Sequence, residues 1–279
     1  MSANQSRYDQ NEYYASNLRG SRLAPCLDFI LNALESTKCY TLKHTAGLKS
    51  GKVLDVGAGS GFFLSKLKKN GYEVFGTTAS SVSAASAERL LGLRLAVSET
   101  LDESRSLGPF DAITYWHVYE HLKDPQSHSN MWTELLKPDG ILLIEVPNID
   151  SIGAKICFKS WLGSDIEHHV NHQEPAQIRQ TLTELGFVIE HTEYFSMKFS
   201  YVLLWSSLLG AAFGKPYYFD RLMFFLKKPL SAIRSNPLVG LNTFASLFYL
   251  MPLICVLIAF GILTKRGEII RLIARRSKS

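Results

Sequence analysis

Residues 53–64 read VLDVGAGSGFFL, and this stretch decides the fold of the chain. The apolar run from Val53 to Val56 predicts a short buried strand that carries one acidic residue, Asp55. Glycines follow at 57, 59 and 61, and an apolar pattern with helical spacing begins at Phe63. Because glycine tolerates positive φ and has no Cβ, a ligand can lie against the backbone of this turn. The helix start adds unpaired N–H groups and a positive dipole end, so the stretch predicts a ligand-binding strand–turn–helix unit.

Three interpretations of the turn compete. A dinucleotide site would need a third glycine at position 62, which is Phe62, and an acidic residue about 20 positions further on, which the sequence lacks. A glycine turn that only packs a helix on a sheet is the structural alternative. The spacing D-x-G-x-G-x-G instead resembles motif I of the class I S-adenosylmethionine-dependent methyltransferases. That resemblance implies that Asp55, Gly57, Gly59 and Gly61 hold the cofactor S-adenosylmethionine.

The resemblance also assigns residues after the next two strands. In the family, the tip of the second strand carries an acidic residue that binds both ribose hydroxyls. Here Thr78 occupies that position and is followed by Ala79. A hydroxyl cannot accept two charge-assisted bonds, which leaves room for weak cofactor binding or for an inactive relative. Glu99 and Thr100 stand where family members place an acidic residue against the adenine, although a solvated loop carboxylate is the alternative.

A second motif lies at residues 110–122, FDAITYWHVYEHL. It resembles motif IV of the quinone O-methyltransferase-like, type 23 branch, and LKPDG at 136–140 with an apolar run to Val146 resembles the turn and fifth strand of the same branch. The resemblance places Trp116 and His117 beside the cofactor. Strands that alternate with helices in this order predict a parallel, doubly wound sheet.

The run from His117 to His121, HVYEH, also matches an inverted zincin pattern. A zinc site needs its ligands on one helix, whereas His117 directly follows a predicted strand. In the quinone O-methyltransferases that bind a divalent metal, a glutamate stands at this position. We therefore predict no metal site, and the alternative is that Glu120 and His121 hold the loop.

The connection at residues 147–174 is too long to be only a link. Its run DIEHHVNH, residues 165–172, resembles the substrate loop of the same branch. A histidine has a pKa near working pH, so His169 or His172 is the predicted general base, with His117 as a further catalytic candidate. Structural hydrogen bonding is the alternative for each.

Charge is divided unevenly along the chain. The net charge is +5, and residues 199–279 hold eleven Lys and Arg against Asp220 and Glu268, so residues 1–198 carry −4. This division predicts a basic C-terminal surface that meets an anionic partner. The four cysteines form no C-x-x-C pair, which fits a reducing cytosol, and the polar N-terminus predicts no signal peptide.

Residues 241–263 contain no charged residue, and neither do residues 199–213. About 34 Å of helix could cross a bilayer core, but a crossing would place basic residues on the wrong side. Because Pro252 lacks an N–H, we predict a re-entrant hairpin bent at Pro252 with interfacial helices. A helical subdomain buried against the protein or a second subunit is the alternative.

The sequence thus predicts four segments. Residues 1–45 form a helical lid that includes a helix at 21–36, residues 46–198 form the methyltransferase domain, residues 199–265 form a hydrophobic insertion between strands six and seven, and residues 266–279 form the closing strand and a basic tail. The predicted fold class is α/β, a Rossmann-like seven-stranded sheet with helices on both faces.

The predicted function is O-methylation of a lipid or lipid-linked glycan hydroxyl at the cytoplasmic face of the cell membrane. The expected partners are that substrate and the membrane surface, with no nucleic acid, and the oligomeric state stays open. The alternative function is a non-catalytic scaffold of the same fold. A nicotinamide-dependent reductase is disfavoured by Phe62 and Thr78.

Overall fold

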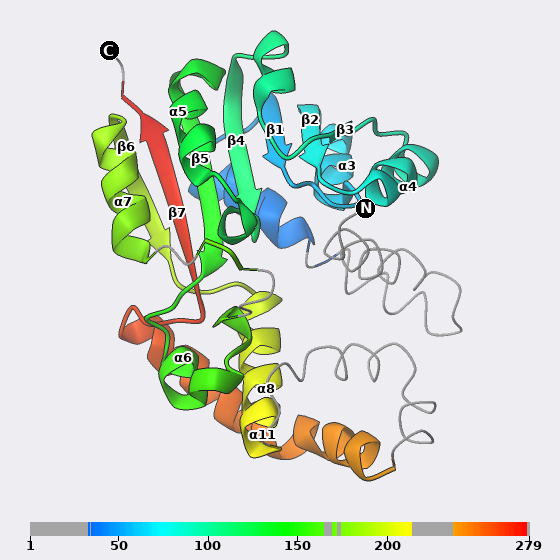
Figure 1. Cartoon of the computed structure of the whole chain (residues 1–279), viewed down its shortest axis with the longest axis vertical. Coiled ribbons are helices and arrows are strands. Elements are labelled where there is room, and N and C mark those ends of the chain that lie inside the picture. Colours follow the sequence, from blue (N-terminus) through cyan, green and yellow to red (C-terminus); the bar gives the residue numbers. More distant parts are fainter. Residues whose placement is uncertain (1–32, 34, 165–168, 172–173, 214–236, 278–279) are drawn as a thin grey trace. The chain divides into compact units, whose positions relative to one another are not determined.

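The computed structural model describes residues 33, 35–164, 169–171, 174–213 and 237–277 (Figure 1). The chain divides into two compact units. The first, called here the sheet unit, comprises Met1–Val146, Ala176–Thr192 and Arg271–Ser279. The second, called the helical unit, comprises Pro147–Pro175 and Glu193–Ile270. Each unit is described by itself.

The sheet unit is built on a seven-stranded sheet with the order β3-β2-β1-β4-β5-β7-β6. β1 pairs in parallel with β2 and β4, β2 with β3, and β4 with β5. Figure 1 shows β7 running opposite to β4 and β5. The strands are β1 (Lys52–Val56), β2 (Glu73–Thr78), β3 (Ala96–Val97), β4 (Phe110–Trp116), β5 (Leu136–Pro147), β6 (Phe187–Glu193) and β7 (Ile269–Arg276).

Helices connect these strands and begin at recognisable caps. Ser80 caps α4 by accepting a hydrogen bond from the Ser83 N–H, and Asp124 caps α5 in the same way through the Ser127 N–H. Pro125 at the first position of α5 and Gly92 in the left-handed conformation after α4 are typical of a helix start and a helix end. The helices are α3 (Phe62–Lys69), α4 (Ser81–Leu91), α5 (Pro125–Leu135) and α7 (Pro175–Glu184).

Shorter helical turns lie between these elements. A π-helical turn follows helical residues 35–40, and two 3-10 turns flank β4. They are η2 (Thr41–Thr45), η3 (Asp102–Ser106) and η4 (Tyr119–His121). The core beside β4 is aromatic: the Trp132 indole N–H donates to the Tyr115 hydroxyl at 3.0 Å, and both side chains are fully buried.

The helical unit contains α6 (Ile152–Cys157), η5 (Phe158–Ser160), η6 (Leu162–Ser164), α8 (Phe199–Ala212) and α11 (Pro237–Leu263). α8 and α11 pack through an apolar cluster made by Leu204, Trp205, Leu209, Ile254 and Ile258. The buried Glu268 carboxylate accepts hydrogen bonds from the Gly153 N–H at 2.8 Å and from the Trp161 indole at 3.0 Å. Burial raises the pKa of Glu268, and these donors oppose that rise.

The predicted fold class is confirmed by the seven strands and their order. The predicted hairpin at Pro252 is wrong, because α11 is one helix that runs through this proline. A proline removes one helical hydrogen bond and bends a helix, whereas a turn inside a long apolar run would leave several backbone groups unpaired. Among the described residues, none of the helices has the length and apolarity needed to cross a membrane. The predicted helix at 21–36 lies almost wholly outside the described residues.

Candidate active site

The strand order reverses between β1 and β4, and the carboxyl ends of these two strands meet there. In open α/β sheets this switch point is where ligands bind. The glycine turn follows β1 at this place, with φ values of 69° at Gly57, 53° at Gly59 and 76° at Gly61. A Cβ on Gly57 would lie 2.5 Å from Cγ2 of Val118, in the loop after β4. Glycine is therefore required at position 57 both for the backbone conformation and for the close approach of the β4 loop.

Asp55 lies at the end of β1 and is 4% exposed. Its Oδ1 accepts a hydrogen bond of 2.6 Å from the Thr114 hydroxyl on β4. Burial raises the pKa of Asp55 to about 7, against the opposing effect of the Lys38 ammonium. Burial thus disfavours the ionised form of this carboxyl group. Ionisable groups with pKa values shifted in this way cluster at functional sites.

Trp116 closes β4 and is 7% exposed. Its ring contacts the Phe63 ring edge-on with centroids 5.6 Å apart. The Lys38 Nζ lies 5.4 Å and the Arg271 Cζ 5.3 Å from the ring, so two cations contact one indole. The buried indole N–H finds no hydrogen-bond partner in the part of the chain that the structure describes. A hydrogen-bond acceptor on a bound ligand would satisfy this indole N–H.

His117 directly follows Trp116 and has a positive φ of 56°. This conformation is strained for a residue with a Cβ, and such strain clusters at functional sites. Its Nε2 lies 2.9 Å from Glu145 Oε1 and its Nδ1 lies 3.4 Å from Glu120 Oε1. Although burial opposes protonation, the two carboxylates raise the pKa of His117. The two carboxylates therefore favour the protonated form of His117.

Glu145, on β5, joins His117 to the neighbouring strand β7. The Arg271 guanidinium donates to Glu145 Oε2 through Nε at 2.7 Å and through a second nitrogen. Although burial opposes ionisation, Arg271 and His117 lower the pKa of Glu145 to about 2. His117, Glu145 and Arg271 thus form one buried network of interacting side chains at the end of β4.

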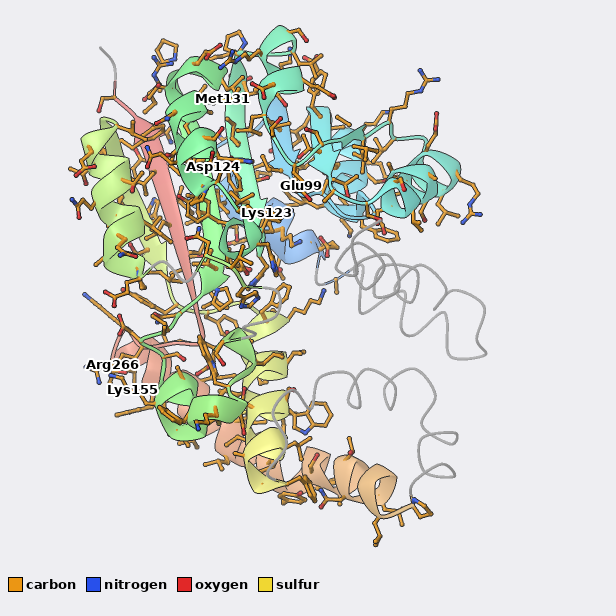
Figure 2. All side chains as sticks on the ribbon, viewed as in Figure 1. Glu99, Lys123, Asp124, Met131, Lys155 and Arg266 are labelled. Carbon is orange, nitrogen blue, oxygen red and sulfur yellow. The ribbon has the colours of Figure 1, made fainter. Side chains whose placement is uncertain are left out.

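The residues predicted to bind the nucleoside lie at the ends of β2 and β3. Thr78 is 3% exposed, and its hydroxyl accepts from the Ser80 N–H at 3.3 Å. The neighbouring Ala79 is exposed. Glu99 follows β3 and forms an ion pair with Lys123 at 3.1 Å (Figure 2). Thr100 is exposed and donates its backbone N–H to the Ser98 hydroxyl.

His169, one of the two predicted general bases of the substrate loop, lies on the helical unit. His169 Nδ1 is 2.8 Å from the Gly163 carbonyl oxygen. A carbonyl oxygen only accepts, so Nδ1 carries a hydrogen and a neutral His169 ring has its lone pair at Nε2. His172 lies outside the described residues.

Comparison with known proteins decides the family. A family model described as a methyltransferase domain matches residues 22–192, more than half of the chain. The chain belongs to the class I S-adenosylmethionine-dependent methyltransferases. The predicted family, enzyme class and cofactor are thereby confirmed. The predicted alternative of a non-catalytic scaffold has no support from these comparisons.

Curated relatives of the methyltransferase include ubiquinone biosynthesis O-methyltransferases. The protein from Erwinia tasmaniensis is 32% identical over 130 residues, which is 44% of this chain and 50% of that protein. The protein from Salmonella paratyphi A is 31% identical over 129 residues, with the same coverage of 44% and 50%. The chain thus spans about half the length of the curated relatives it matches.

Solved structures share the fold at low identity. A SAM-dependent methyltransferase from Archaeoglobus fulgidus has a TM-score of 0.53 and 19% identity over 87% of this chain and 94% of that chain. A mycolic acid cyclopropane synthase complexed with SAH and CTAB has a TM-score of 0.54 and 16% identity over 86% of this chain and 84% of that chain. At these identities the likeness shows the fold alone.

The residues of the switch point fit S-adenosylmethionine. The positive-φ glycines leave the backbone open to a ligand, and the Trp116 indole N–H needs an acceptor. Asp55 lies at the end of β1 and becomes ionised as pH rises through about 7, so it supplies a carboxylate that suits a cofactor carrying a sulfonium and an ammonium.

Three residues of the enzyme's site were missed by sequence reasoning: Lys38, Glu145 and Arg271. The signal for Glu145 and Arg271 was present, because each is a charged residue inside an otherwise apolar strand sequence. Charges in buried strands need partners, and opposite charges on two strands of one sheet predict a pair. Lys38 carries no comparable signal.

Proposed function

We propose that this methyltransferase methylates a hydroxyl oxygen of a lipid or lipid-linked glycan at the cytoplasmic face of the cell membrane. The reaction type is supported by the curated relatives, whose names describe O-methylation in ubiquinone biosynthesis. When bound, S-adenosylmethionine would supply a methyl group whose bond to the sulfonium sulfur breaks as the acceptor oxygen bonds to it, with S-adenosylhomocysteine as the leaving group. The protein's task is then to position the acceptor and to remove its proton.

His169 is the proposed general base. Its Nδ1 donates to the Gly163 carbonyl, so Nε2 is the ring nitrogen that we propose accepts the hydroxyl proton. His117 is poorly suited to this role, because each of its ring nitrogens already faces a carboxylate, of Glu120 and of Glu145, and both carboxylates raise its pKa. We assign His117 to orientation of the loop at the end of β4. His172 stays a predicted second candidate.

One observation carries the proposal of a lipid acceptor. The loop that holds His169 belongs to the same compact unit as the uncharged helices α8 and α11. The Leu162 N–H in this loop donates to the Ser207 hydroxyl of α8 at 2.9 Å. A substrate loop that packs on apolar helices suits an acceptor met at a lipid surface better than one met in water.

The test is methyl transfer from radiolabelled S-adenosylmethionine to fractionated cell lipids and to water-soluble metabolites. Label should enter an organic-phase product as an ether. His169→Gln should lower turnover by roughly 100-fold while cofactor affinity stays unchanged. His191→Gln is the matched control, because His191 is exposed on β6 and should leave turnover unchanged. Full turnover in His169→Gln would place the base elsewhere.

A further inference from the structure

We propose that the outward face of α11, with the adjoining segment 155–159, docks the enzyme onto an anionic lipid bilayer and lies in its headgroup region. This inference deepens the proposed function, since it names the surface by which the enzyme would meet a lipid acceptor. It rests on three independent features of the helical unit: the exposed apolar stripe of α11, the inward position of its polar residues, and the cations at its end.

The first feature is the stripe. From Leu253 to Leu263 large apolar side chains of α11 are exposed at intervals of three or four residues, and the exposed ones before them lie in the same half of the helix circumference. α11 has 27 residues, so the stripe is about 35 Å long. Its members are Leu238 (84% exposed), Leu241, Phe248, Leu253, Val256 (64%), Phe260 (56%) and Leu263 (82%). Contiguous exposed apolar surfaces of this extent mark interaction sites.

The second feature is an inverted distribution of polarity. Thr243 is 1% and Ser246 0% exposed, and Ser246 accepts a hydrogen bond of 2.8 Å from the Trp205 indole of α8. The α8 residues Ser206 and Ser207 are also buried. A helix that faces water turns its polar residues outward, whereas here small hydroxyl residues join the helices and apolar ones point out. Helices packed in lipid share this arrangement.

The third feature is charge. Lys155, Lys159, Lys265 and Arg266 are exposed. The Ile152 N–H donates to the Arg266 carbonyl at 3.1 Å, and Figure 2 shows Lys155 and Arg266 close together at the end of α11. In the same region Ile156 is 55% and Phe158 72% exposed. Asp150 is the one acidic residue within the described segments 148–164 and 237–267.

The combination of an exposed apolar stripe and a cluster of cations indicates what binds the outward face of α11. Apolar side chains beside a cluster of cations match an interface of acyl chains and anionic headgroups, which attracts basic residues near its surface. A second copy of the chain would bring more of the same cations to the contact and would supply no cluster of anions. We therefore assign the face to a bilayer, and self-association becomes an outcome that the test distinguishes.

The experiment is flotation of the full chain with vesicles of phosphatidylcholine alone or mixed with phosphatidylglycerol. The wild type should float with the mixed vesicles. Val256→Asp combined with Phe260→Asp should weaken vesicle binding roughly 100-fold, because two exposed apolar side chains that would enter the bilayer are replaced by charged ones. Val188→Asp is the matched control, since Val188 is 59% exposed on β6 in the sheet unit. Circular dichroism and S-adenosylhomocysteine affinity should be unchanged in both variants.

The cations are tested separately. Lys265→Glu combined with Arg266→Glu should reduce binding to the mixed vesicles roughly 10-fold and leave any binding to neutral vesicles unchanged. A loss that is equal on both kinds of vesicle would overturn the electrostatic part of the proposal.

The position of the face is read by a fluorophore on Cys255, which is exposed on α11, after Cys26, Cys39 and Cys157 are replaced. Its emission should rise with vesicles and be quenched by spin-labelled lipids. No vesicle binding, or equal binding by the Val256→Asp, Phe260→Asp variant, would overturn the proposal. A concentration-dependent dimer that this variant abolishes, without any vesicle binding, would assign the face to a second copy. Since no methyl transfer is measured, a failure here is separate from a failure of the proposed reaction.

Discussion

Replacement of Asp55 by Asn should make the free enzyme more stable above pH 7 while weakening its binding of the cofactor. Burial raises the pKa of Asp55 from 3.8 to about 7. Because a tenfold change in a protonation equilibrium corresponds to about 1.4 kcal/mol, ionised Asp55 costs the native state roughly 4 kcal/mol above pH 7. The opposing attraction of Lys38 is already contained in this shift. The Asn amide N–H groups are buried in the variant, and a buried donor left without a partner costs about 1–3 kcal/mol, which reduces the gain. We expect about 2 kcal/mol of net stabilisation, which corresponds to roughly 5 °C in Tm.

The pH dependence of the unfolding free energy gives the sign of the effect of Asp55→Asn. Because the folded pKa is the higher one, the stabilisation that Asp55 contributes is fully present below about pH 4 and is lost as pH rises through about 7. The difference in unfolding free energy between Asp55→Asn and the wild type should therefore be small near pH 4, grow with pH and level off above pH 7. Urea unfolding at a series of pH values measures it, and the amide oxygen can still accept from Thr114.

Asp111→Asn is the control of opposite sign. Although partial burial opposes ionisation, Lys137 and the Lys52 N–H lower the pKa of Asp111. Its replacement should destabilise the protein above pH 4. If Asp55→Asn is no more stable than the wild type at pH 8, or if its affinity for S-adenosylhomocysteine is unchanged, Asp55 is not a desolvated cofactor ligand and the reasoning fails.

Three further predictions concern the same site. Thr78→Asp should tighten cofactor binding up to roughly tenfold in calorimetry, because a carboxylate accepts stronger bonds from ribose hydroxyls; weaker binding would show that the site is packed around the hydroxyl. Glu145→Gln should have a lower Tm than the wild type above about pH 4.5. This difference should disappear as pH falls toward about 2, because the wild type then loses the stability that ionised Glu145 contributes. If Tm depended on pH in the variant as it does in the wild type over this acid range, the buried pair of Glu145 with Arg271 would be contradicted. Gly57→Ala should lower both Tm and cofactor affinity, because its Cβ would lie 2.5 Å from Val118; a variant with normal values would rule out the tight approach.

Local signals explain why much of the fold could be predicted. The run from Val53 to Leu64 contains a strand, its turn and a helix start within twelve residues, so their relation depends on the backbone alone. The structure has β1 at Lys52–Val56 and α3 at Phe62–Lys69. The closing strand predicted within residues 266–279 lies at β7, Ile269–Arg276.

The charged network could not be predicted in the same way. The contact of Arg271 with Glu145 joins residues 126 positions apart, and it depends on β7 entering the sheet beside β5. The prediction of a hairpin at Pro252 was wrong for a different reason. It rested on the backbone preference of one proline, whereas the helix α11 continues on both sides of Pro252 because neighbouring residues stabilise it. In both cases tertiary packing, which local patterns do not contain, decided the outcome.

The identity of the methyl acceptor is the central claim, and one measurement tests it most directly. Purified enzyme is given radiolabelled S-adenosylmethionine together with total membrane lipids, and the label is followed into organic and aqueous phases, with His169→Gln as the inactive reference. The account predicts label in a lipid-phase product that survives mild alkali, as an ether does, and that is strongly reduced in the variant. Label that enters only water-soluble products, or a lipid product formed equally by the variant, would contradict it.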